Sequence, residues 1–253
     1  MLCTTFKKLS EDTWEQIDLS KTAGYQLKEE TLTDQNLLQL KIKHPTEILI
    51  RAFNKHEEGR NGADWEWWLT DGNEWVGFRV QAKIINIETD RFEHLHYQAK
   101  TSVPQSRKLI EQSKPIGEKP RVPIYCMFLS TEKFDPAALK SAPEFYGCSI
   151  MSAYTVAVLR DSGTDDVVSL QAYLIPWHEL VCQKPAISFA EHIDRFLVER
   201  LDQGILDVRF YITDEPPAYV SALLVNNNHT VENEYGNPDL AGVMVAKLYN
   251  NTE

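Results

Sequence analysis

Long hydrophobic runs are missing from this chain of 253 residues. None approaches the roughly 18 consecutive apolar residues that a membrane-spanning helix needs. The first residues, MLCTTFKKLSED, contain no apolar stretch of the kind that forms the centre of a secretory signal. The sequence therefore predicts a soluble, cytoplasmic protein without a membrane partner.

Several common motifs are also missing. The sequence contains no Gly-x-Ser-x-Gly turn, no phosphate-binding glycine-rich loop and no Gly-x-Gly-x-x-Gly fingerprint. Its four cysteines, Cys3, Cys126, Cys148 and Cys182, are scattered and form no Cys-x-x-Cys pair, which argues against a zinc knuckle. For a cytosolic protein we expect all four to be reduced thiols.

Basic residues are fewer than acidic ones, 26 Lys and Arg against 37 Asp and Glu, which gives a formal net charge of −11. This balance excludes a globally basic clamp for nucleic acid. Between Lys100 and Arg121, however, six basic residues face only two acidic ones. The segment is either a solvated helix face with a loop or a set of phosphate contacts, for which the candidates are Lys100, Arg107, Lys108 and Lys114.

Hydrophobic residues make up 43% of the sequence, which is enough for a substantial core. The chain is organised around three β-patterned runs, Ile48–Phe53, Ala63–Thr70 and Glu74–Lys83. Turn residues, including Asp71-Gly72-Asn73, separate them. Side chains alternate faces along a strand. The last run therefore has an apolar face, predicted to be core, and an opposite face that carries Arg79, Gln81 and Lys83.

Outside these runs the periodicity predicts further elements. They are helices near 11–19, after Thr31 or Thr33, near 103–113 and over 189–201, a buried strand over 122–130, and late strands over 208–212 and 240–248. The runs 150–160 and 167–177 fit a hairpin, although 153–159 also fits a helix.

The central runs resemble the PD-(D/E)xK restriction-endonuclease-like superfamily. The matching residues are Asp64-x-Glu66 at the start of one strand and Gln81-Ala82-Lys83 at the end of the next, and the Gln-x-Lys form is similar to Mrr-type restriction enzymes. The resemblance covers about residues 29–130. The sequence departs from the superfamily pattern at Ala63, where proline is frequent, and at Gln81, where an acid is frequent and would supply one more anionic ligand.

The resemblance implies an α/β fold in a single domain, residues 1–253. Its restriction-endonuclease-like core, a mixed central sheet flanked by helices, would span about 29–130, with a C-terminal α/β extension over about 131–253. Strands near 47–54, 63–70 and 75–85 would be neighbours in one sheet, with 122–129 added to it.

The resemblance also implies a site. Its catalytic residues would be Asp64, Gln81, Lys83 and Glu30, with Glu66, Glu29, Glu58 and Gln105 as further candidates. Mg²⁺, or Mn²⁺ as a substitute, would be bound by Asp64, Glu30, the Gln81 carbonyl oxygen and the Ala82 backbone oxygen. Lys83 would orient or deprotonate the attacking water and stabilise the anionic transition state.

By this resemblance we expect a Mg²⁺-dependent endonuclease that hydrolyses DNA, in bacterial defence or mobile-element biology. One alternative is a non-catalytic module that binds nucleic acid or protein and retains the fold, and another is an enzyme of a different class. Without the resemblance, Asp64 and Lys83 would be read as a cross-strand surface ion pair. Homo-oligomerisation stays open, and no motif indicates a protein partner.

Overall fold

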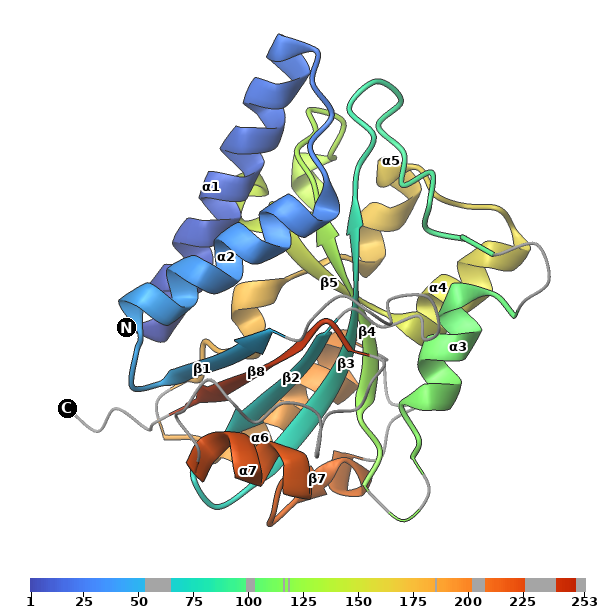
Figure 1. The fold of residues 1–253 in the computed structure, drawn as a ribbon. Coiled ribbons are helices and arrows are strands. Elements are labelled where there is room, and N and C mark those ends of the chain that lie inside the picture. Colours follow the sequence, from blue (N-terminus) through green and yellow to red (C-terminus); the bar gives the residue numbers. More distant parts are fainter. Residues whose placement is uncertain are drawn as a thin grey trace.

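The structure, a computed structural model, describes residues 1–52, 65–98, 103–115, 117, 119–184, 186–201, 208–225 and 240–248. In these residues the protein is an α/β fold built on a mixed sheet of eight strands, with helices on both faces (Figure 1). The predicted fold class is confirmed at this level.

The N-terminal part consists of two helices followed by strands. Helix α1 (Leu2–Ala23) ends at Gly24, whose φ of 63° is a left-handed cap that favours glycine. Helix α2 (Glu29–Lys43) ends before His44-Pro45, as predicted, because the residue before a proline disfavours helical geometry. The strands β1 (Ile48–Ala52), β2 (Trp65–Thr70) and β3 (Trp75–Ile84) come next.

Strands β2 and β3 form an antiparallel pair in which Glu66 faces Arg79. The turn between them is fixed by Asp71, whose carboxylate accepts hydrogen bonds from the backbone N–H groups of Asn73 and Glu74. Helix α3 (Gln105–Gln112) then crosses over to β4 (Val122–Phe128), which runs parallel to β3. This strand–helix–strand order agrees with the prediction.

The C-terminal half contributes strands to the same sheet. Its helices and strands are β5 (Cys148–Ser152), α4 (Ala153–Asp161), α5 (Val167–Leu170), β6 (Ile175–Pro176), α6 (Phe189–Asp194), β7 (Ile212–Thr213), α7 (Ala218–Val225) and β8 (Gly242–Lys247). Short 3₁₀ turns are η1 (Pro136–Ala138), η2 (Pro143–Tyr146), η3 (Gln171–Tyr173), η4 (Trp177–Leu180) and η6 (Val208–Phe210), and α6 continues as a π-helical segment, η5 (Arg195–Leu201).

One predicted strand neighbour is wrong. The sheet order is β1-β8-β2-β3-β4-β5-β6, so β8 lies between β1 and β2, antiparallel to the first and parallel to the second (Figure 1). Gly242 permits this insertion, because a Cβ there would lie 2.3 Å from the Trp65 ring and 2.5 Å from the Arg51 carbonyl oxygen. The C-terminal segment thus completes the sheet.

Other expectations are corrected in detail. Helix α1 starts at Leu2, far before the predicted residue 11, and buries Phe6, Leu9 and Ile17. The run 150–160 divides into β5 and α4, and only β6 of the run 167–177 pairs with β5. The run 208–212 is a 3₁₀ turn followed by the two-residue β7.

Two of the cysteines are also bonded to each other rather than reduced. Cys3 and Cys182 form a disulfide across 179 positions of sequence, whereas Cys126 and Cys148 are free and buried. The early start of α1 places Cys3 beside the segment after η4. Neither that start nor this proximity is visible from the cysteine spacing, so the expectation of four reduced thiols is wrong for this pair.

The two faces of the central strands differ as the alternation predicts. Trp65, Trp67, Val80 and Ala82 face α2, which contributes Leu37 to the same apolar lining. The opposite face carries the polar side chains of β3 and is covered by α3 and α7, which bond to it through the Gln105 side chain, the Gln112 carbonyl oxygen and the Tyr219 hydroxyl. A polar layer is therefore buried beneath these two helices.

Candidate functional site

The candidate site is built on a row of three polar side chains on β3. Arg79, Gln81 and Lys83 alternate with the apolar residues of the strand and are only 4%, 2% and 5% exposed. Such side chains are rarely buried unless they are paired or hydrogen-bonded. Their partners therefore show how the row is held.

Lys83 lies at the end of the row, one residue before β3 ends. Its Nζ is 3.8 Å from Oε1 of Glu29, the first residue of α2. Glu30 is exposed and makes no described ion pair with Lys83. Of the two acids considered for this position, the structure brings Glu29 to the lysine.

Gln81 is held from α3. The Gln105 side-chain amide donates a hydrogen bond of 2.8 Å to Gln81 Oε1, and Gln81 Nε2 donates to the Ala82 carbonyl oxygen at 3.3 Å. These two bonds fix the orientation of the Gln81 amide. Gln105, a further candidate in the sequence, is thus in direct contact with the Gln-x-Lys motif.

Glu66 lies inside a cluster of donor groups rather than beside Lys83. Its carboxylate is fully buried and accepts hydrogen bonds from Trp68 Nε1 at 3.2 Å and from the Tyr219 hydroxyl. Arg121 Nε lies 3.5 Å and Arg79 Nη1 4.0 Å from Glu66 Oε1. Four donors therefore surround the carboxylate, and we interpret Glu66 as the centre of a structural ion cluster.

This cluster joins distant parts of the chain. Arg79 Nη1 also donates to the Gln112 carbonyl oxygen at the end of α3, at 3.0 Å. Arg121 donates to the Tyr219 hydroxyl at 3.0 Å. Burial, followed by the charge of Glu66, raises the pKa of Tyr219, so that its hydroxyl stays protonated and can donate.

Arg79 was placed on the polar face by the sequence, and Arg121 lies within its basic segment, but neither was assigned a role. Tyr219 was missed entirely. It lies on a helix of apolar residues 153 positions from Glu66, and no local pattern marks it. Only the packing of α7 on the sheet reveals it.

The basic candidates lie on α3 and the segment after it. Arg107 is exposed and Lys108 half-buried on α3, and the exposed Lys114 places its Nζ 5.7 Å from the centre of the Tyr154 ring. On α3, Arg107 and Lys108 outnumber the exposed Glu111, while Gln105 and the Gln112 carbonyl oxygen contact Gln81 and Arg79. Lys100 lies outside the described residues.

Two acids of the predicted site, Asp64 and Glu58, also lie outside the described residues. Asp64 directly precedes Trp65, the first residue of β2, in the sequence. Within the described ranges, no group of three or more His, Cys, Asp and Glu side chains is placed to hold a metal ion. This finding does not apply to a ligand set that includes Asp64, because Asp64 is not among the described residues.

Comparison with known proteins leaves the activity open. No helix in the described part of the chain has the length and apolar character needed to cross a membrane. Neither the curated proteins nor the solved structures contain a match to the sequence. The sequence model of one family, the family of unknown function DUF6615, matches residues 2–251, and the chain therefore belongs to this family.

Proposed function

We propose that this protein is a Mg²⁺-dependent endonuclease of restriction-endonuclease-like fold that hydrolyses phosphodiester bonds of DNA. The observation that carries the proposal is the placement of Lys83. A lysine that is 5% exposed at a strand end, two residues after Gln81 and 3.8 Å from Glu29, costs free energy to bury. We take this cost as the sign that Lys83 serves the function of the protein rather than its fold.

The order of elements supports the proposed fold. Helix α2, the antiparallel pair β2–β3, the crossover helix α3 and the parallel strand β4 follow one another in the order expected from the resemblance, although β1 is not the expected neighbour of β2. Strand β8, inserted next to β2, is then an addition from the C-terminal extension. Because the extension shares the sheet with the core, we propose a single domain.

The oxygen atoms offered around the end of β3 are of the kind that a hard divalent cation binds. Glu29 offers a carboxylate, and Gln81 and the Ala82 backbone offer neutral oxygens, of which Mg²⁺ needs only a few because it retains water ligands. Asp64, next to β2 in the sequence, is the proposed second carboxylate. When bound, Mg²⁺ would polarise the phosphoryl group as a Lewis acid.

The chain's own residues would perform the remaining tasks. The Lys83 ammonium can donate to a phosphoryl oxygen and stabilise the negative charge that develops in the transition state. Gln105 holds the Gln81 amide in one orientation through its 2.8 Å bond. Two exposed cations, Arg107 on α3 and Lys114 just after it, would contact the phosphate backbone beside the site.

One observation favours the alternative, a non-catalytic binding module that retains this fold. The Gln81 oxygen already accepts a hydrogen bond from Gln105, and glutamine replaces an acid at this position, so the site carries one anionic ligand fewer. Such a module would bind DNA through the cations of α3 without cleaving it.

An assay for cleavage of supercoiled plasmid distinguishes the endonuclease from the non-catalytic binding module. The proposal predicts nicked or linear product with Mg²⁺, none with a chelator, and none from Asp64→Ala. Glu29→Gln and Glu30→Gln form a matched pair: the first should lose activity and the second should retain it, because only Glu29 reaches Lys83. Binding without cleavage by the wild type would support the module, and chelator-resistant cleavage would contradict the proposed chemistry.

A further inference from the structure

The Cys3–Cys182 disulfide differs from the other cysteines in its access to solvent. Cys3 lies in the first turn of α1 and Cys182 just after η4, and both are partly exposed. Cys126 and Cys148 are 2% and 0% exposed, and burial raises the pKa of the Cys148 thiol to about 12. Only the bonded pair is therefore open to thiol chemistry in the folded protein.

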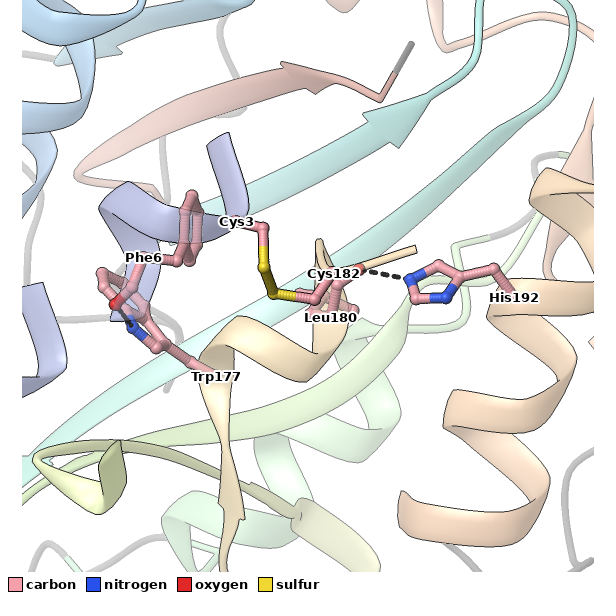
Figure 2. Close-up of a disulfide and its surroundings, with 6 residues drawn as sticks. All are labelled: Cys3, Phe6, Trp177, Leu180, Cys182 and His192. Carbon is pink, nitrogen blue, oxygen red and sulfur yellow. Dashed lines mark hydrogen bonds between the residues drawn. A yellow bond between two sulfur atoms is a disulfide. The ribbon is translucent and has the colours of Figure 1, made fainter. Parts of the chain in front are cut away.

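Non-covalent contacts beside the disulfide join α1 to η4 and η4 to α6 (Figure 2). The Phe6 and Trp177 rings lie 4.5 Å apart between their centres, and Trp177 Nε1 donates to the Phe6 carbonyl oxygen at 2.8 Å. His192 Nε2 donates to the Leu180 carbonyl oxygen at 2.9 Å, just before Cys182. These buried contacts remain in place when the sulfur–sulfur bond is broken.

The far end of α1 has its own attachments. Lys21 Nζ donates to the Ser130 carbonyl oxygen at 2.7 Å and to Asp90 at 3.0 Å. Gln26, in the connection to α2, bonds to the backbone of Ile85 and Ile87. The first turn is attached as well, through the 2.7 Å hydrogen bond between Thr5 Oγ1 and His44 Nε2 and the packing of Leu2 on the core, so we expect α1 to stay docked when the disulfide opens.

From this arrangement we propose that Cys3–Cys182 is a reversible thiol–disulfide exchange site, which a dithiol reductant opens in the folded protein. A thiolate of the reductant attacks one sulfur of the bond, and the other cysteine leaves as a thiolate and takes up a proton. The second thiol of the reductant resolves the mixed disulfide. The protein gains two electrons and two protons, and the reductant becomes a disulfide.

Opening this bond changes stability rather than fold. The bond closes a loop of 179 positions, and in the chain-entropy description long loops constrain the unfolded chain most. For a chain of this size we expect the melting temperature of the reduced protein to fall by about 10 °C. The inference is independent of the proposed nuclease activity.

Native alkylation with mass spectrometry and thermal melting test the proposal. The oxidised protein should take up no label. After dithiothreitol it should take up two labels, at Cys3 and Cys182, with an unchanged circular dichroism spectrum at 25 °C and a lower melting temperature. Removal of the reductant under oxidising conditions should restore the starting values.

Two variants serve as controls. The double variant Cys3→Ser/Cys182→Ser should melt like the reduced wild type and no longer respond to dithiothreitol, whereas Cys126→Ala should respond fully. Labelling without reductant, no labelling after it, loss of the folded spectrum, or an unchanged melting temperature in the labelled wild type would each overturn the proposal.

Discussion

The assignment of Glu66 to a structural cluster predicts a large loss of stability in Glu66→Gln. Glutamine keeps the shape of the side chain but removes the charge between Arg79 and Arg121 and turns one acceptor oxygen into a donor. The carboxylate is fully buried, so solvent does not screen the change. Removing one partner of a buried ion cluster costs about 3–5 kcal/mol.

Urea unfolding at neutral pH, in the presence of a chelator, measures this loss. With an unchanged slope, the midpoint should shift in proportion to the lost free energy of unfolding. Glu30→Gln provides the matched control: Glu30 is exposed, and we expect a change within about 0.5 kcal/mol.

The result also decides between two roles for Glu66. A structural carboxylate stabilises the protein equally with and without Mg²⁺, whereas a metal ligand contributes only when the metal is bound. A Glu66→Gln variant as stable as the wild type in chelator, or one whose deficit appears only with Mg²⁺, would refute the structural assignment.

Two further predictions concern pH and packing. Burial, helped by the charge of Lys7, lowers the pKa of His178 to about 4 from its usual 6.5. The unfolded chain therefore binds this proton more readily than the folded protein does. As a result, the melting temperature should fall as the pH drops from 6.5 towards 4. His178→Gln should flatten this dependence and the exposed His94→Gln should not, and equal slopes in the wild type and His178→Gln would contradict the assignment. Gly147→Ala should destabilise the protein by about 3 kcal/mol in urea unfolding, because the added Cβ would lie 2.0 Å from the Ser10 carbonyl oxygen on α1. A change in the free energy of unfolding of less than about 0.5 kcal/mol would show that α1 is not packed this closely.

The sequence predicts local structure well where one strand pairs with the next. The pair β2–β3, the polar row of β3 and the crossover through α3 to β4 all follow from alternation and turn residues. These features depend on neighbouring residues in the chain. The same reasoning predicts a strand over 240–248, and the structure contains it as β8.

The sequence does not predict which segments pair when they lie far apart in the chain. Nothing in the pattern of β8 specifies that it inserts between β1 and β2, and nothing near Cys3 points to Cys182. Alternation marked Arg79 as polar, but its burial depends on α3 and α7 covering that face. Tyr219 was invisible for the same reason, since its role exists only in the packed fold.

The structure brings some of the candidate residues into contact, while their roles stay predictions. Gln105 bonds to Gln81, and Glu29 rather than Glu30 lies beside Lys83, because the first residue of α2 points towards the end of β3. The choice between two adjacent acids depends on where the helix begins, and helix ends are the least certain part of a prediction from sequence. The role of Asp64 stays a prediction.

Cleavage of supercoiled plasmid by Lys83→Met, compared with the wild type in Mg²⁺, tests the central claim most directly. Methionine retains most of the aliphatic stem and removes the ammonium, and Lys43→Met, exposed at the end of α2, is the matched control. We predict that Lys83→Met cleaves about 10²–10³-fold more slowly at an unchanged fold, while Lys43→Met cleaves like the wild type. Full activity of Lys83→Met at an unchanged circular dichroism spectrum would contradict the account.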